Sequence, residues 1–289
     1  SRLSLSLLLL LVHADDTPPD SPNPFRQCLR SAVDTFFLDP DETPSSEDLT
    51  VSFSDLYDFV TSALQDPAVS FSASMLLYYM LQSCKTFAQF VTSKLDPESL
   101  VLPMLATLAK FSNTLEGERG HVYVLLIILL VLSNDAILMR TLHATRVPHL
   151  PWMTERITSA NMPMSLADAI FVVLLRLVQT SFLRLQDVYL QNNALAVLAN
   201  LAGHYENIHP HTASRVVALL NLLLLEHKRL RTRLLRCMEE VAPAAAEHTA
   251  RVQEEERLRD DVAFVWDYVR MTVELVNSIL MAGGGGGPP

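Results

Sequence analysis

Apolar residues recur at helical spacing along most of this chain of 289 residues. The first clear stripe consists of Phe53, Leu56, Tyr57, Val60 and Leu64, which stand one, three or four positions apart. This spacing gathers apolar side chains on one side of a helix. We therefore expect an amphipathic helix here, and the same reasoning predicts a succession of helices behind it.

Similar stripes, separated by turn residues, predict the later helices. They are expected at 75–91 (as one long helix or two short ones), 98–108, 121–132, 136–143, 152–160, 165–186, 187–204, 211–226 and 254–279. Asp96-Pro97-Glu98 and Ser133-Asn134-Asp135 are typical of helix starts, because an Asp side chain accepts backbone N–H groups there and Pro fits the first turn. Pro103 predicts a kink or a later start in its helix. The segment 116–120 is expected to form a turn.

The first 50 residues follow a different pattern. Residues 13–50 contain six prolines and many acidic residues, so helices cannot run through most of this stretch. The segment Phe25 to Leu38 is the one candidate for a short helix there. Before it, Leu5 to Val12 is an apolar run that we interpret as the end of a core helix. A signal peptide is the alternative, although only Arg2 precedes the run as a basic residue.

These patterns predict an all-α fold. Adjacent helices with wide apolar faces and short connections are typical of an α-solenoid built from HEAT- or armadillo-like helix pairs. No strict sequence period is present, so an irregular helical bundle is the alternative. We expect a truncated helix end with a Pro- and acid-rich loop region at 1–52. A helical-repeat domain is expected at 53–281, and a Gly/Pro low-complexity tail at 282–289.

Composition narrows the class of protein. Hydrophobic residues make up 49% of the chain and charged residues 19%, which is enough apolar surface to exclude wholesale disorder. Five of the eight glycines stand together at 283–287. The scarcity of glycine elsewhere disfavours β-hairpins, phosphate-binding loops and dinucleotide folds. The longest apolar run, 122–132, is shorter than the ~20 residues that cross a bilayer.

Charge and cysteine usage narrow the class of protein further. The chain carries 22 basic against 32 acidic residues, a formal charge of −10, which disfavours nonspecific nucleic-acid binding. Cys28, Cys84 and Cys237 are too few and too far apart for a disulfide framework, which fits a reducing compartment. We expect no cofactor, no metal and no small-molecule substrate.

Candidate catalytic groups are sparse. His204, His209 and His211 place three imidazoles within eight residues, but no partner motif stands near them, and we interpret them as a solvated helix–helix loop. Cys84 and Cys237 lie in apolar stretches and are interpreted as core thiols. The chain contains no GxSxG, HExxH, Walker or GxGxxG motif. We therefore predict that it is not an enzyme.

A basic cluster is the first candidate for binding. It consists of Lys228, Arg229, Arg231, Arg233 and Arg236, within nine residues of an otherwise acidic chain. Such a cluster suits anionic lipid headgroups or an acidic partner. The alternative is a solvated helix face paired with nearby glutamates.

Two asparagines are the second candidate. The segment 189–202 is similar to the third helix of an armadillo repeat, in which an Asn is available to hydrogen-bond a bound peptide backbone. Asn193 and Asn200 would take this part, and their separation by seven residues puts them on the same helix face. The alternative is a surface or helix-capping role.

The chain as a whole resembles the dymeclin family. The similarity covers nearly all of residues 1–280 and is carried by the segments 6–27, 96–105, 121–136, 151–157, 187–223 and 267–280. The resemblance implies that Leu5 to Val12 is an interior helix and that the chain is the interior-to-C-terminal part of a longer protein. The MAGGGGGPP tail departs from the family, and we interpret it as a gene-model artefact or a low-complexity insertion.

The resemblance also carries expectations about function. Family members are associated peripherally with the Golgi apparatus and exchange with the cytosol, and their myristoylation glycine would lie upstream of Ser1. The family offers no site residues to transfer. Our hypothesis is a non-catalytic Golgi-associated scaffold that supports Golgi organisation and vesicle trafficking through protein–protein binding, with weak peripheral membrane contact. The alternative is an armadillo-like cytosolic peptide-binding adaptor in transport or signalling.

Overall fold

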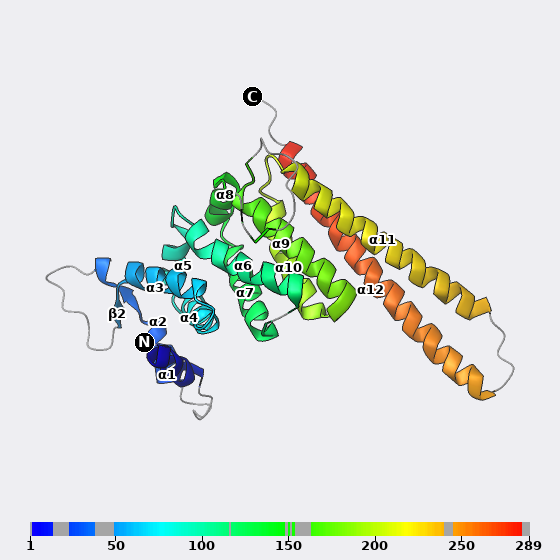
Figure 1. Ribbon diagram of the computed structural model, residues 1–289, viewed down its shortest axis with the longest axis horizontal. Helices are drawn as coiled ribbons and strands as arrows, with labels where there is room; N and C mark the ends of the chain where they lie inside the picture. The colour runs from blue at the N-terminus through cyan, green and yellow to red at the C-terminus, as the bar shows by residue number, and fades with distance from the viewer. Residues whose placement is uncertain are drawn as a thin grey trace. The chain divides into compact units, whose positions relative to one another are not determined.

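The computed structural model describes residues 2–13, 23–37, 49–115, 117–147, 150, 152–153, 163–239 and 245–284, and regular structure in them is almost entirely helical (Figure 1). The all-α prediction is therefore confirmed. The α-helices are α1 (Arg2–His13), α2 (Pro24–Arg30), α3 (Phe53–Gln65), α4 (Ser70–Ser83), α5 (Lys85–Thr92), α6 (Glu98–Thr114), α7 (Arg119–Leu132), α8 (Ala136–Ala144), α9 (Leu166–Thr180), α10 (Val188–Ala202), α11 (Pro210–Glu239) and α12 (Ala245–Gly284).

The chain divides into two compact units. Unit 1 comprises residues 1–155 and 163–200, and unit 2 comprises residues 156–162 and 201–289. Helices α1 to α9 and most of α10 belong to unit 1. Unit 2 is dominated by the two long helices α11 and α12.

Helix α9 forms the centre of unit 1. Every residue from Leu166 to Leu175 is buried, and the helix packs against α6 and α8. Its first turn is closed by a reciprocal pair of side-chain bonds. Ser165 Oγ accepts from the backbone N–H of Asp168 at 3.0 Å, and the Asp168 carboxylate accepts from the Ser165 N–H at 3.3 Å. This capping box satisfies donors that no water can reach, since Asp168 is itself buried.

The end of α9 differs from the single long helix expected at 165–186. The last turn widens into a π-helix, η2 (Ser181–Leu185), which ends at Gln186 with a left-handed φ of 51°. Ser181 Oγ donates to the Asp187 carbonyl at 3.2 Å and accepts from Gln191 Nε2 at 3.2 Å. These bonds fasten the end of one helix to the start of α10.

Helix α9 and η2 together form the one described helix that is long and apolar enough to cross a membrane, Leu166–Leu185. Of its most apolar window, 72% is buried inside the protein. Helices α7 and α8 pass the same test only as a pair, and they are bent by 104° at their junction. Burial of this kind is typical of core helices.

The helix expected at 25–38 is longer than the helix that the structure contains there. Helix α2 ends at Arg30, and the chain then forms a two-residue parallel pairing between β1 (Val33–Asp34) and β2 (Thr50–Val51), followed by the 3₁₀ turn η1 (Thr35–Phe37). The buried carboxylate of Asp34 accepts from the backbone N–H of Phe53 at 3.3 Å. This bond ties the pairing to the first turn of α3, which the sequence predicts correctly.

Other expectations are confirmed or refined at the helix starts. The 75–91 stretch is two helices, and buried Cys84 caps the second by accepting from Phe87 N–H at 3.4 Å. The Asp135 cap is confirmed, with bonds of 2.9 Å from Ile137 and Leu138. The prediction that the Asp96 side chain caps α6 is wrong, because the Asp96 carboxylate accepts from the Ser99 hydroxyl and not from a backbone N–H. Helix α6 nevertheless begins at Glu98 and runs through Pro103.

Two expected elements fall partly or mostly outside the described residues. They are the helix at 152–160, of which residues 152–153 are described, and Glu116 of the expected turn. In the described part of that turn Gly117 is left-handed at φ 122°, and Leu115, which precedes the turn, is left-handed at φ 57°.

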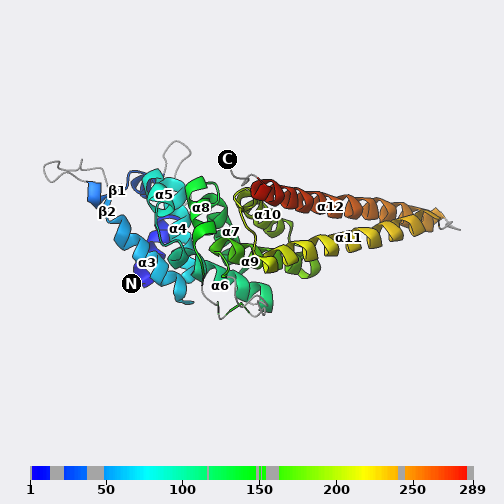
Figure 2. The same ribbon diagram turned by 90° about the horizontal axis from the view of Figure 1, so that it is seen from above.

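Unit 2 corrects the sequence analysis most. Helix α11 does not end at residue 226 but continues to Glu239, and α12 begins at Ala245, earlier than expected. The two helices lie side by side as an antiparallel hairpin (Figure 1 and Figure 2). Apart from the adjacent pair Tyr268 and Val269, their buried residues stand three, four or seven positions apart, which is the spacing of a coiled coil. In α11 they are Thr212, Val216, Leu219, Leu223 and Leu230, and in α12 they are Leu258, Val265, Tyr268, Val269, Thr272, Leu275 and Ile279.

We predict that Ser165→Ala destabilises the protein by about 1–2 kcal/mol, because it removes the hydroxyl that accepts from the Asp168 N–H and donates to the Asp168 carboxylate in the buried capping box. The measurement is urea unfolding followed by circular dichroism at 222 nm. Ser54→Ala, at an exposed position in α3, is the matched control and is expected to stay within about 0.5 kcal/mol of the parent. Equal unfolding midpoints for the two variants would contradict the prediction.

Candidate functional site

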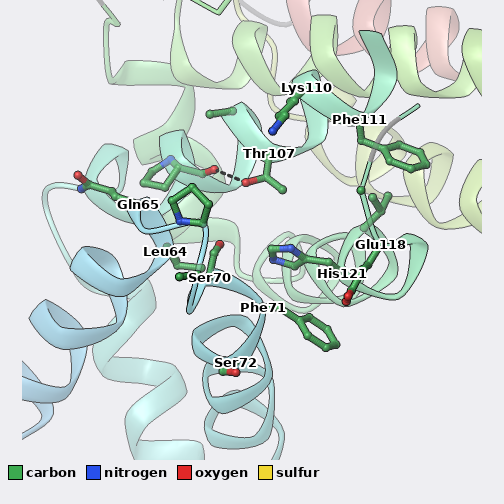
Figure 3. Close-up of a pocket in the computed structure, with 16 residues that line it drawn as sticks. Leu64, Gln65, Ser70, Phe71, Ser72, Thr107, Lys110, Phe111, Glu118 and His121 are labelled. Carbon is green, nitrogen blue, oxygen red and sulfur yellow. Dashed lines mark hydrogen bonds between the residues drawn. The ribbon is translucent and has the colours of Figure 1, made fainter. Parts of the chain in front are cut away.

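A groove of about 760 Å³ opens on unit 1 between three segments that are separate in the sequence (Figure 3). One wall is the end of α3 with the turn into α4, from Leu64 to Ser72. The second is the middle of α6, from Pro103 to Phe111, and the third is the start of α7, from Gly117 to Val122. The left-handed residues before α7 turn the chain back along α6 and so bring the second and third walls together.

The groove combines an apolar floor with a polar rim. Leu64, Phe111 and Val122 are buried at its base, whereas Lys110 and Glu118 are exposed at its edge. The lining residues are Leu64, Gln65, Pro67, Ala68, Ser70, Phe71, Ser72, Pro103, Ala106, Thr107, Lys110, Phe111, Gly117, Glu118, His121 and Val122. A lining of this kind offers apolar contact together with one charge of each sign.

His121 is the most distinctive group in the groove. Its ring lies 5.4 Å from that of Phe71, centre to centre, and its Nε2 is 3.0 Å from Ser74 Oγ. The single hydroxyl hydrogen of Ser74 points to the Ser70 carbonyl, which is 2.8 Å away. Ser74 Oγ therefore accepts from an Nε2–H of His121.

This arrangement does not serve nucleophilic catalysis. A base needs an unprotonated nitrogen facing the nucleophile, but His121 presents a donor to Ser74. The Ser74 side chain is also fully buried, out of reach of a substrate. Burial lowers the pKa of His121, partly offset by the negative charge of Glu118, and so favours the neutral ring. The Ser74–His121 bond thus holds α4 against α7.

The two asparagines singled out in the sequence lie in α10, both half-buried. Asn193 Nδ2 donates to the Tyr189 carbonyl in its own helix at 2.8 Å. Asn200 Nδ2 donates to Ser133 Oγ, beyond the end of α7, at 2.8 Å. Each amide thus makes a bond within the chain, and the role of both residues in peptide binding stays a prediction.

The five residues of the basic cluster are all exposed on α11, but they do not form one patch. At about 100° per residue, Arg229, Arg233 and Arg236 fall on one side of the helix, and Arg231 falls on nearly the opposite side, with Lys228 between them. Arg229 lies 3.5 Å from Glu226, and Arg233 lies 3.4 Å from Glu254 of α12. The cluster is therefore divided between two faces of the hairpin. Its binding to lipid or to an acidic partner stays a prediction.

The histidine loop is less solvated than expected, because His209 is buried. Its Nδ1 accepts from the His211 N–H at 3.1 Å, and its carbonyl accepts from the Ala213 N–H at 3.0 Å. His209 therefore caps the start of α11. The described residues contain no group of three or more His, Cys, Asp or Glu side chains placed to hold a metal ion.

One contact that sequence reasoning missed joins α7 to the start of α10. The Tyr123 hydroxyl donates to the Asp187 carboxylate, and the Tyr123 ring meets that of Tyr189 edge-on at 5.1 Å. The hydrogen bond to Asp187 raises the pKa of Tyr123. Since 64 residues separate the two partners, no local sequence signal indicates the pairing.

Comparison with known proteins gives one consistent result. The family model described as "Dymeclin: Dyggve-Melchior-Clausen syndrome protein" matches residues 1–284. Dymeclin of Xenopus laevis is 31% identical over 280 residues, and Dymeclin of Mus musculus is 30% identical over 277 residues. Each alignment covers 96% of this chain and 39% of the relative. Dymeclin of Drosophila melanogaster is 32% identical over 275 residues, which is 95% of this chain and 37% of that protein. No solved structure matches the chain significantly.

We predict that the free energy of unfolding decreases as the pH falls below about 6.5, in part through His121. Burial holds its pKa below 6.5 in the folded protein, so the unfolded chain takes up the proton first and is favoured by acid. In His121→Gln this contribution is lost, while the amide still donates to Ser74. Urea unfolding at several pH values between 5 and 7.5 measures the effect.

Asn113→Gln, at an exposed position in α6, changes no titratable group; it is the control and is expected to keep the parent's pH dependence. If His121→Gln loses stability with falling pH as steeply as the parent does, the burial of His121 does not contribute.

Proposed function

Because the chain belongs to the dymeclin family, we propose that it is part of a non-catalytic scaffold that supports Golgi organisation and vesicle trafficking by binding other proteins. The chain spans about 39% of the length of the curated vertebrate relatives it matches. The proposal therefore concerns the contribution of this chain to a larger protein. Recruitment to the Golgi from the cytoplasm, through peripheral contact, is part of the same proposal.

The groove of unit 1 is the observation that carries protein binding. Small-molecule sites are mostly apolar and bury most of their ligand. This groove instead has exposed residues along its rim and opposite charges at Lys110 and Glu118. An extended segment of a partner can place an apolar side chain on the floor near Leu64 and Phe111, and the two charges then fix its direction.

The buried position of Ser74 supports a non-catalytic role. It is the serine that stands within hydrogen-bond distance of the groove's histidine, yet it cannot meet a ligand in the groove. Dymeclin is not a known enzyme family. Binding without chemistry is thus the function that the groove supports best.

The stacking of helix pairs is the structural part of the proposal. Within unit 1, helices pack on the next helix or on one three elements away in the chain: α3 on α4, α4 on α7, α6 on α7 and α9, and α8 on α9. Neighbour-to-neighbour packing is what HEAT- and armadillo-like solenoids use to extend a surface. A surface of this kind suits a scaffold that holds partners side by side.

Location in cells tests the Golgi assignment. The full-length protein that contains this chain, tagged and imaged beside a cis-Golgi marker, is expected to overlap with the marker and to disperse when the Golgi is disassembled with brefeldin A. A diffuse signal that is indifferent to the state of the Golgi would contradict the assignment and favour a cytosolic adaptor.

Rescue of Golgi morphology tests the groove. In cells that lack the protein, the double variant Phe71→Ser, Lys110→Glu is expected to lose most of the rescue, because it removes a rim aromatic and inverts a rim charge. Phe59→Ser is the matched control, since Phe59 is exposed to 47% and Phe71 to 39%, and Phe59 does not line the groove. Full rescue by the double variant, at equal expression, would exclude the groove from the function.

A further inference from the structure

The hairpin of unit 2 has one face that is apolar beyond its own seam. The heptad assigns positions a and d to the seam, and positions e and b follow next to a around the helix. In an antiparallel pair, the e and b positions of both helices lie on the same face of the hairpin. The ring contact between His227, at e in α11, and Trp266, at b in α12, confirms this geometry with 5.1 Å between centroids.

We call this surface the apolar face and define it by its b positions. They are Val217, Leu224, Arg231 and Met238 in α11, and Val252, Arg259, Trp266, Val273 and Leu280 in α12. Seven of these nine residues are apolar, although b positions of a two-stranded coiled coil are normally polar because they face water. The half-buried e residues Leu220, Leu234, Val262 and Val276 fill the space between the two rows.

The apolar face is exposed where it is most hydrophobic. Leu224 is exposed to 41%, Trp266 to 51%, Val217 to 54% and Val273 to 40%. The contacts of His227 with Trp266 and of Arg233 with Glu254 bracket the antiparallel register, and they place Leu224 near the level of Trp266 and Val217 near the level of Val273. Two rows of large side chains therefore run along this face of the hairpin.

The opposite side of α12 has the usual character of a coiled-coil surface. There the corresponding positions hold Gln253, Asp260, Asp267 and Glu274, all exposed, with Met281 as the apolar exception near the end of the helix. The apolar positions on the first face thus recur with the heptad, which is the arrangement that a further helix would require.

The two arginines on the apolar face differ in whether a carboxylate is paired with them. Arg259 is neutralised by Glu255 at 2.5 Å. Arg231 is exposed, and among the described residues no carboxylate forms an ion pair with it or with the neighbouring Lys228. In a chain with a formal charge of −10, this end of the face presents an uncompensated positive charge beside apolar side chains.

We infer that the apolar face binds one amphipathic helix of a partner protein, whose acidic residues meet Arg231 and Lys228. The third helix lies along the apolar face beside both α11 and α12 and completes a three-helix bundle. Between Trp266 and Leu280 alone the apolar face is about 21 Å long at 1.5 Å per residue, which accommodates four turns of the incoming helix. This inference names the partner class of the proposed protein-binding scaffold and rests on that function.

A second copy of the chain fits this face less well. Two apolar faces brought together would oppose arginines to apolar side chains or to each other, because the carboxylate of Glu255 is already paired with Arg259. An uncompensated charge in a buried interface is costly. An acidic helix meets both the apolar and the charged part of the face.

A membrane surface also fits less well. Helix α11 carries six basic and two acidic residues, but α12 carries four basic and eight acidic residues, so the hairpin has no excess of positive charge. Attraction of amphipathic elements to anionic lipid depends on such an excess.

The experiment uses Trp266 as its own reporter. The full 289-residue chain with Trp152→Phe keeps Trp266 as its sole tryptophan, since the parent has two. The probe is a synthetic 28-residue helix with leucines at its core heptad positions and glutamates flanking them, compared with the same helix carrying lysines in place of the glutamates. Saturable binding with a blue shift of Trp266 emission is expected, and the acidic peptide should bind at least about tenfold more tightly.

Two leucines that are adjacent in the sequence provide the matched variants. Leu224→Glu, on the apolar face, is expected to weaken binding of the acidic peptide by at least about thirtyfold, as at a binding hot spot. Leu225→Glu is expected to bind as the parent does, because Leu225 lies on the other side of α11 although it is exposed to 69%. Circular dichroism checks that both variants keep the helicity of the parent.

Four results would overturn the inference. They are no binding of either peptide, equal effects of Leu224→Glu and Leu225→Glu, a concentration-dependent dimer that Leu224→Glu abolishes, and a blue shift caused by phosphatidylserine vesicles but not by the acidic peptide. Peptide binding with failure of the Golgi tests would reject the cellular role alone. Golgi localisation without peptide binding would reject the apolar face alone.

Discussion

Helix α9 is surrounded by other helices, so the backbone groups at its two ends have to be satisfied from within the protein. This requirement explains two features that are unusual when each is taken separately. The buried carboxylate of Asp168 is held at the N-terminus because it and Ser165 exchange hydrogen bonds there. The π-helical turn at the C-terminus allows Gln186 N–H to reach the Ser181 carbonyl, and Ser181 Oγ is hydrogen-bonded to Asp187 and Gln191 at the start of α10. The remaining helices of unit 1 are placed around a helix that is closed at both ends.

The groove and the hairpin represent two ways in which a helical protein leaves surface available for partners. In unit 1 the groove lies between α6, α7 and the turn from α3 into α4, where the left-handed turn at Leu115 and Gly117 leads the chain from α6 back into α7. In unit 2 the surface arises because a two-helix seam uses only a narrow stripe of each helix, while the sequence provides a wider apolar stripe than the seam needs. The first surface suits an extended segment and the second suits a helix.

The sequence predicted the helices of unit 1 well where apolar spacing and capping residues agree, as at Phe53, Asp135 and the 121–132 helix. It missed the pairing of residues 33–34 with 50–51, because two residues are too few to show a period. It ended α11 too early, because the run of apolar residues ends at Leu225 and charged residues dominate the stretch 226–236. The groove could not be predicted at all, since its walls come from three distant segments. The sequence placed Asn193 and Asn200 correctly on one helix. It could not indicate the bond from Asn200 to Ser133, because 67 residues separate these two partners.

The seam of the hairpin changes character along its length. Near the start of α11 it is formed by Leu219 and Leu223 against Val265 and Leu275, all buried, whereas farther out Leu230 and Leu258 are followed by the exposed pair Arg233 and Glu254. An exposed ion pair contributes at most about 1 kcal/mol, far less than a layer of buried leucines. We therefore expect the two helices to separate first at their connected end, near residue 239. Amide hydrogens near Cys237 should then exchange with water faster than those near Leu219. Thermal motion at the connected end is thereby uncoupled from the end at which the two helices hold each other most firmly.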